Sequence, residues 1–184
     1  MINRHLILPL SIRYGFFCGI SQIALLVTIL AGGGSIYHPA MALGWIITYV
    51  YLHRFVKSLR ENEGEGYISF RHAYFGGMTL SFFAFLLYGL LLFLLGAFAF
   101  PEILTDARNE LLRNAEAMER IFSSNSIFKA DDLHEAYENI TLGQFAYSES
   151  LSKFLGALFL SLIAALILRR KQPPAQHDQS NPLA

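Results

Sequence analysis

The chain has 184 residues, of which 54% are hydrophobic and 15% charged, and its 14 Lys and Arg residues balance 14 Asp and Glu residues. A soluble domain carries about a quarter charged residues, so this composition is too apolar for one. It also excludes a disordered chain, because Phe alone supplies 16 residues. The single cysteine excludes a disulfide-built module, and the zero net charge argues against nucleic-acid binding. A polytopic membrane protein remains.

The first uncharged stretch, residues 14–53, is forty residues long. A helix needs about 20 apolar residues to cross the hydrocarbon core of a bilayer, so this stretch can make two crossings if the chain turns in the middle. Three consecutive glycines at 32–34 provide such a turn, and Pro39 suits the first turn of a second helix. The stretch therefore predicts two spans.

Two further uncharged stretches predict two more spans. Residues 73–101 are rich in Phe and Leu, and their length fits one long or tilted helix. Residues 154–168 would make about 22 Å of helix, which is too short to cross. We therefore extend this helix back toward Gln144, which places Glu149 and Lys153 as a pair at the membrane interface, where the lysine can reach water. The four predicted spans are 11–31, 39–55, 73–100 and 147–168.

The distribution of Lys and Arg predicts the orientation. With four spans, both termini and the loop between spans two and three share one side, which carries nine Lys and Arg residues against five on the other. The positive-inside rule then places both termini in the cytoplasm. Ten of the 14 acidic residues lie within 102–149. We expect an all-α protein with one membrane domain over residues 1–171, an acidic extracytoplasmic side, and a disordered cytoplasmic tail at 172–184.

The large segment between spans three and four, residues 101–143, has a helical pattern. Apolar residues recur at three- and four-residue steps along an otherwise charged stretch, at Leu104, Ala107, Leu111, Ala115, Met118 and Phe122. A break at 123–126 precedes a shorter predicted helix around Leu133 and Tyr137. Two interpretations stay open: the segment lies on the membrane or on the spans, or it offers a docking face to a partner protein.

Small residues recur every four positions in three of the predicted spans, a spacing that lets helix backbones approach closely in lipid. The candidate packing residues are Gly15, Gly19, Gly77, Ser81, Ala157, Ser161 and Ala165. We expect them to pack helices within the bundle, with homodimerisation through the same stripes as the alternative. Gln22, the one amide deep within a span, is interpreted as an interhelical hydrogen-bonding group, and the alternative is the polar lining of a transport path.

Signals for catalysis or metal binding are weak. His134, Glu135 and Glu138, with Asp131 one turn before them, offer ligands for a divalent cation, but the zinc-protease signature requires a second histidine in place of Glu138. A solvated acidic helix face is the simpler interpretation. The sequence has no phosphate loop, nucleophile elbow or Cys/His cluster. We therefore expect no catalytic residue, no metal and no cofactor.

Short motifs near the predicted helix ends resemble those of a known family. Residues 66–70 read Gly-Tyr-Ile-Ser-Phe before the third span, Tyr14-Gly15 opens the first, and Pro101-Glu102 precedes the charged helix. Together they are similar to the Bacteroidota integral-membrane family named domain of unknown function 4199, over about residues 13–171. The resemblance implies four spans in a bacterial inner membrane and supplies no catalytic residues. Family members usually carry an acid or amide where this chain has His72, which weakens the predicted helix cap at Ser69.

Three functional hypotheses follow from these features. The first is a non-enzymatic accessory or scaffold subunit that acts through helix packing and its acidic segment, with the lipid bilayer, a second copy of the chain or an envelope protein as partner. The second is a small transporter or channel subunit that works as an oligomer. The third is a lipid- or envelope-modifying enzyme that uses His72, His134 and Glu135.

Overall fold

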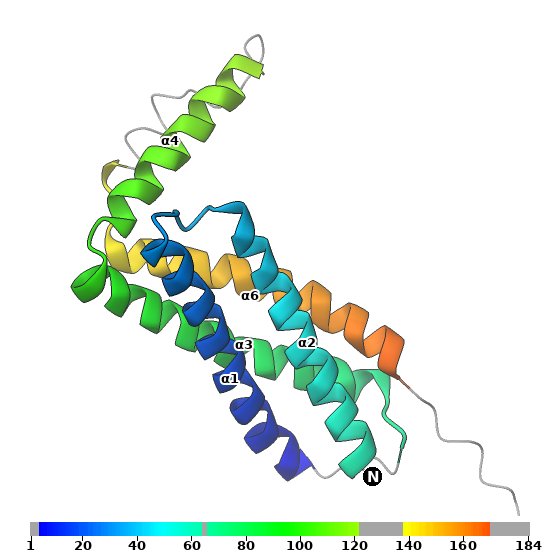
Figure 1. Ribbon diagram of the computed structural model, residues 1–184. Coiled ribbons are helices and arrows are strands. Elements are labelled where there is room, and N and C mark those ends of the chain that lie inside the picture. Colours follow the sequence, from blue (N-terminus) through cyan, green and yellow to red (C-terminus); the bar gives the residue numbers. More distant parts are fainter. Residues whose placement is uncertain (1–3, 64–65, 122–137, 170–184) are drawn as a thin grey trace, which may run out of the picture.

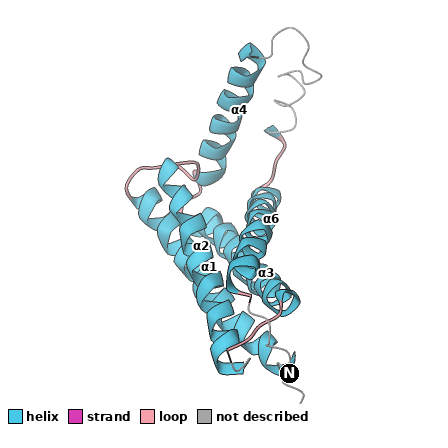
Figure 2. Ribbon diagram, turned by 90° about the vertical axis from the view of Figure 1, so that its right-hand side faces the viewer, coloured by secondary structure: helices cyan, strands magenta, loops and turns pink. Residues whose placement is uncertain are grey.

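The computed structural model describes residues 4–63, 66–121 and 138–169, which fold as an all-α protein (Figure 1). Four helices form a bundle and a fifth projects from one end of it, as two views at right angles agree (Figures 1 and 2). The α-helices are α1 (Arg4–Ala31), α2 (Leu43–Ser58), α3 (Phe70–Leu94), α4 (Ile103–Ile121) and α6 (Leu142–Leu168). A 3₁₀ turn, Pro39–Ala42, leads into α2, and π-helical turns at Leu59–Glu63 and Leu95–Ala99 extend α2 and α3.

Three of the described helices are long and apolar enough to cross a membrane: Ile7–Ala31, Phe70–Ala99 and Leu142–Leu168. They correspond to the first, third and fourth predicted spans, and each begins before its predicted start. The last of them begins at Leu142 because Thr141 and Gln144 form a complete capping box there. Large apolar side chains stand on the outer surface of these helices, as Phe98 does with 83% of its surface exposed. Such a surface suits lipid, so the three helices indicate association with a bilayer.

The second predicted span, 39–55, is a shorter element in the structure. Pro39 begins the 3₁₀ turn, and the side chain of His38 accepts a hydrogen bond from the backbone N–H of Ala40. The α-helix that follows has 16 residues and rises about 24 Å. It is therefore shorter than the three long apolar helices, although it runs beside them across the bundle (Figure 1).

The core of the bundle is arranged around α3, which packs against α1 and against α6. Buried apolar side chains gather in two clusters. One lies toward the α4 end and includes Phe85, Tyr88 and Phe145. The other lies toward the opposite end and includes Phe55 and Leu80. Both clusters join residues that are far apart in the sequence, so the bundle is held by tertiary contacts along its whole length.

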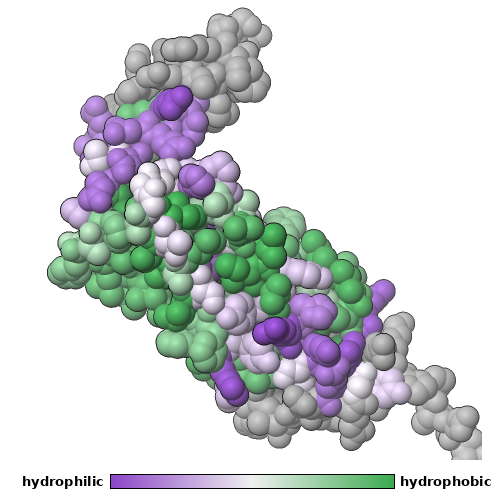
Figure 3. Space-filling model, viewed as in Figure 1, coloured by the Kyte–Doolittle hydropathy of each residue, from purple (hydrophilic) through white to green (hydrophobic). Residues whose placement is uncertain are grey.

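The surface is divided between polar ends and an apolar middle (Figure 3). The charged helix α4 is hydrophilic, the bundle below it is mostly apolar, and polar residues return at the far end of the bundle. The helix α4 corresponds to the first of the two helices predicted within residues 101–143. The shorter helix predicted around Leu133 and Tyr137, the break at 123–126 and the tail at 172–184 lie outside the described residues.

Candidate functional site

The contact between α1 and α3 depends on two glycines of α1. A Cβ atom on Gly15 would lie 2.8 Å from the carbonyl oxygen of Leu80, and one on Gly19 would lie 2.7 Å from that of Ala84. Both distances are shorter than a van der Waals contact, so no larger residue fits without moving a helix. The two backbones touch because the side chains between them are absent.

The contact between α3 and α6 uses the small residues of both helices. A Cβ atom on Gly77 would lie 3.1 Å from Oγ of Ser161, and the hydroxyls of Ser81 and Ser161 are 3.4 Å apart. Ala157 and Ala165 of α6 are fully buried. The residues named as packing candidates in the sequence are therefore occupied by contacts within one chain.

A first buried polar cluster surrounds Gln22 and joins α1 to α2. The Gln22 side chain is 1% exposed, and its Nε2 donates to the carbonyl oxygen of Gly44 at 2.5 Å and to Oγ1 of Thr48 at 2.8 Å. The Oε1 atom of Gln22 is buried and has no hydrogen-bond partner among the residues that the structure describes. These contacts enclose the amide between two helices and make it an interhelical link.

A second polar cluster lies where α2, α3 and α6 meet. The Nζ atom of Lys153 lies 5.2 Å from the ring centroid of Tyr88 and 5.9 Å from that of Trp45. Glu149, one turn earlier in α6, is near enough to interact with the lysine charge. Tyr88 is fully buried, and its hydroxyl has no hydrogen-bond partner in the described part of the chain. The lysine thus points into the bundle, where two aromatic faces stabilise its charge.

Sequence reasoning missed this second cluster. It placed Glu149 and Lys153 at the membrane interface, because the uncharged stretch 154–168 is too short to cross and the helix must begin before it. The aromatic partners come from other helices, and Tyr88 stands in a run of Phe and Leu with nothing to mark it as a contact of Lys153. Trp45 is the only tryptophan in the chain, and it was the one residue in the sequence that could have suggested an aromatic partner for a lysine.

The base of α4 is fixed to the bundle by its first two turns. Ala107 is buried against the core, and Arg108 donates through Nη2 to the carbonyl oxygen of Ile140, just before α6. Oγ of Ser35, in the turn after α1, donates to Oε2 of Glu110 at 2.9 Å. These contacts hold α4 to the ends of α1 and α6.

Comparison with protein-family models identifies a family for this chain. The model of a family described as "Protein of unknown function (DUF4199)" covers residues 13–170. The chain belongs to the DUF4199 family. The resemblance drawn from the short motifs is thereby confirmed. Neither the curated proteins nor the solved structures contain a match to this DUF4199 chain.

A helix cap formed by Ser69 lies at the start of α3. Oγ of Ser69 accepts a hydrogen bond from the backbone N–H of His72 at 3.4 Å, so Ser69 caps the helix. Nδ1 of His72 lies 2.7 Å from the same Oγ. The histidine therefore pairs with the capping hydroxyl, whereas a Glu or Gln at this position would reach the backbone N–H of Ser69.

The cation site weighed from the sequence is not tested by the structure. His134, Glu135 and Asp131 lie outside the described residues, and Glu138 is described and exposed. Within the described ranges, no group of three or more His, Cys, Asp and Glu side chains could hold a metal ion.

Proposed function

We propose that this DUF4199 protein is a non-enzymatic accessory or scaffold subunit of an envelope complex, and that α4 with the acidic segment around it docks the partner. One observation supports the proposal: α4 projects from the bundle, and its first two turns are held against the bundle by the contacts described above (Figure 2). The contacts described above reach only as far as Glu110. The helix continues for 11 more residues, to Ile121, which is about 16 Å of helix.

A rigid projecting helix suits a docking element better than a catalytic one. Its base is held by burial and hydrogen bonds, so its direction relative to the bundle is set before a partner binds, and preorganisation lowers the entropic cost of binding. Arg113 and Asn114, beyond the base, are exposed. The small-residue stripes of the spans are occupied inside the chain, which favours α4 over the spans as the docking surface.

We further propose that α2 is a fourth span and that both termini are cytoplasmic in a bacterial inner membrane. The 3₁₀ turn and α2 together rise about 32 Å, close to the thickness of a hydrocarbon core. Leu43 and Ile46 are 50% and 60% exposed, as lipid-facing side chains would be. The basic residues Lys57 and Arg60 follow at its end. This topology supports an extracytoplasmic position for α4.

Reporter fusions test the topology. Reporters at residue 4 and at residue 171 are expected on the same side of the membrane, and a reporter at Asn125 on the opposite side. Three spans would instead place the two ends on opposite sides. A cytoplasmic signal from the Asn125 fusion would reject the proposed orientation.

Photo-crosslinking in living cells tests the docking function. A photoreactive amino acid at Arg113 or Asn114 is expected to give a discrete adduct with another envelope protein. The same residue at Phe98, which is exposed on the bundle, serves as the matched control and is expected to label lipid only. If the α4 positions give no protein adduct and the solubilised chain is a strict monomer, the scaffold proposal is wrong.

A transporter subunit is the second candidate, and the two buried polar clusters favour it. Ionisable side chains within membrane helices often mark ion or substrate paths, and Glu149 and Lys153 both lie within α6. Flux measured in liposomes, with Gln22→Leu and Lys153→Met as variants, separates the two candidates. A flux that either variant abolishes supports transport, whereas a flux that both leave intact removes these clusters from any path.

A further inference from the structure

A pocket with a volume of about 430 Å³, here called the Arg71 pocket, lies where α1 and α3 begin. Ile7 of α1 lines it together with residues from the cap and the first turns of α3: Ser69, Arg71, His72, Phe75, Gly76 and Thr79. Two of the candidate spans start here, at Ile7 and at Phe70. The pocket therefore lies where the chain meets one surface of a bilayer, at the end of the bundle opposite α4 (Figure 1).

The inner part of the Arg71 pocket is apolar. Oγ1 of Thr79 donates to the carbonyl oxygen of Phe75 at 2.9 Å, and the carbonyl oxygen of Gly76 accepts from Oγ of Ser11 at 3.3 Å. These polar atoms are thus already used within the chain. The Phe75 side chain is 50% exposed and offers an apolar wall, so this part of the pocket suits a hydrocarbon chain.

The outer part of the pocket holds a cation without a counter-charge. Arg71 is exposed, and in the described part of the chain no carboxylate forms a salt bridge with it. The first turn of α3 has no acidic residue. The planar fork of a guanidinium matches the oxygens of a phosphate group. The charge of this part therefore favours an anionic ligand.

The depth of the pocket matches one leaflet of a bilayer. Along α3 its lining runs from Ser69 to Thr79, which is about 15 Å of helix, half of a hydrocarbon core about 30 Å thick. The cation lies at the membrane surface and the apolar part reaches inward. A phospholipid has the same order of polarity, with its phosphate outside and its acyl chains inside.

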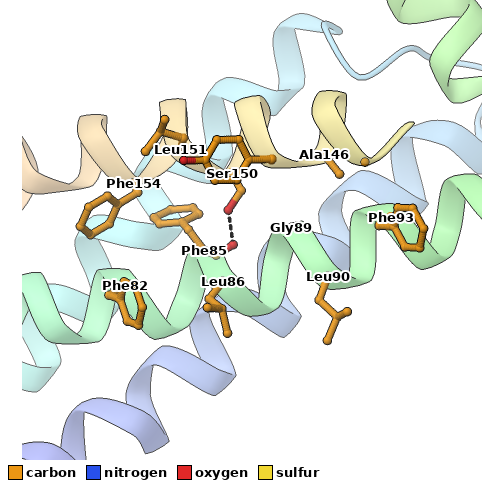
Figure 4. Close-up of a pocket in the computed structure, with 12 residues that line it drawn as sticks. Phe82, Phe85, Leu86, Gly89, Leu90, Phe93, Ala146, Ser150, Leu151 and Phe154 are labelled. Atoms are coloured by element: carbon orange, nitrogen blue, oxygen red, sulfur yellow. Dashed lines mark hydrogen bonds between the residues drawn. The ribbon is translucent and has the colours of Figure 1, made fainter. Parts of the chain in front are cut away.

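A second groove on α3 has a similar volume, about 460 Å³, but lacks the cation. It runs between α3 and α6, and apolar side chains such as Phe82, Leu86 and Phe154 line most of it (Figure 4). None of its lining residues is charged, and the Ser150 hydroxyl donates to the carbonyl oxygen of Phe85, as the dashed line in Figure 4 marks. This groove offers no means of selecting one headgroup over another, so it serves as an internal control for the Arg71 pocket.

We propose that the Arg71 pocket binds one anionic phospholipid, with the phosphate at Arg71 and an acyl chain along Phe75 toward Thr79. This site goes beyond the proposed docking function and needs neither a partner protein nor a particular orientation in the membrane. A free phosphate ion would leave the apolar part of the pocket empty. A zwitterionic lipid would bring a second cation close to Arg71. An anionic lipid matches both parts of the pocket.

Native mass spectrometry of the purified full-length chain tests the site. The wild type is expected to retain one phosphatidylglycerol molecule in preference to phosphatidylcholine with the same acyl chains. Arg71→Ala is expected to weaken phosphatidylglycerol binding about fivefold, the usual effect of one basic residue near a membrane surface. Arg169→Ala removes an exposed arginine at the same end of the bundle and outside the pocket lining, and it is expected to bind as the wild type does. Equal losses in the two variants, or no lipid preference in the wild type, would overturn the proposal.

Two substitutions at His72 test the charge of the pocket while Arg71 stays in place. Glu and Gln can both form a capping box with Ser69, so both variants are expected to keep the start of α3. His72→Glu brings a negative charge into the pocket lining and is expected to bind phosphatidylglycerol at least about fivefold more weakly than His72→Gln. Equal binding by the two variants would contradict the site.

A labelling experiment on the wild type avoids the risk that a variant misfolds. Phosphatidylglycerol with a photoreactive group on its acyl chain is expected to label residues 69–79 more strongly than phosphatidylcholine with the same group. Both lipids are expected to label residues 82–93 and 143–154 equally. Loss of the label at 69–79 when inorganic phosphate is added would overturn the proposal in favour of a free anion. Crosslinks between two copies through 69–79, in place of lipid labelling, would overturn it in favour of a second copy.

Discussion

At the residue scale, two positions of α1 require glycine because backbone atoms of α3 leave no room for a side chain. Gly15 and Gly19 face backbone carbonyls of α3, which cannot swing aside as a flexible side chain could. Their four-residue spacing was visible in the sequence. The identity of the facing atoms was not, because nothing local in α1 indicates which helix lies opposite.

A single methyl group at Gly19 is expected to destabilise the protein. Gly19→Ala puts a Cβ atom 2.7 Å from the carbonyl oxygen of Ala84, so we expect the free energy of unfolding to fall by about 1–3 kcal/mol. Gly143→Ala is the matched control, because its Cβ atom meets open space. Equilibrium unfolding in mixed micelles measures both. Equal stability of the two variants would contradict the close approach of α1 and α3.

At the element scale, the start of α6 shows how local signals set a helix boundary. Oγ1 of Thr141 accepts from the backbone N–H of Gln144, and Oε1 of Gln144 accepts from that of Thr141. The length argument from the sequence extends this helix back toward Gln144 and starts span four at 147, whereas the Thr-x-x-Gln cap starts the helix at Leu142. Hydropathy alone was too coarse, because it averages over a window and does not register caps.

Removal of this cap is expected to loosen the first turn of α6. Thr141→Ala should lower the free energy of unfolding by about 1 kcal/mol, the usual cost of losing such a cap. Thr105→Ala, at an exposed position of α4, provides the comparison and should have little effect. Hydrogen exchange at residues 142–145 should also increase in Thr141→Ala alone. Unchanged exchange there would mean that tertiary contacts, not the cap, hold this turn.

Lys153 of α6 contacts an aromatic ring of α2 and one of α3. Lys153→Met removes the interaction with the rings of Trp45 and Tyr88 and leaves Glu149 without its partner, so we expect a loss of about 1–2 kcal/mol. A second substitution, Glu149→Gln, is expected to recover at least about 0.5 kcal/mol of it. The cycle is measured by unfolding in the same micelles. Purely additive effects would show that the two charges do not interact.

At the scale of the whole molecule, the apolar middle of the surface indicates that lipid, and not water, surrounds the bundle. The three candidate spans expose many large apolar side chains, and on the face that Figure 3 shows polar residues gather at the ends of the molecule. Water cannot solvate such a surface without a large free-energy cost.

We therefore expect the purified chain to require an amphiphile. On removal of detergent it should aggregate, whereas transfer into nanodiscs should keep it monodisperse, as light scattering would show. A chain that stays monodisperse in plain buffer would refute the membrane assignment, together with the proposals that depend on it.

The sequence alone determined that this is an all-α protein with at least three apolar helices, because a run of residues without charge is a local property of the chain. The fourth predicted span stays a proposal, because α2 has only 16 residues and is shorter than the three candidate spans. Only the tertiary structure decided which helix faces met. It turned Lys153 toward Tyr88, enclosed Gln22 against Gly44, and brought Arg108 of α4 to the carbonyl oxygen of Ile140. These juxtapositions depend on how helices distant in sequence cross and rotate, and no local pattern encodes that geometry.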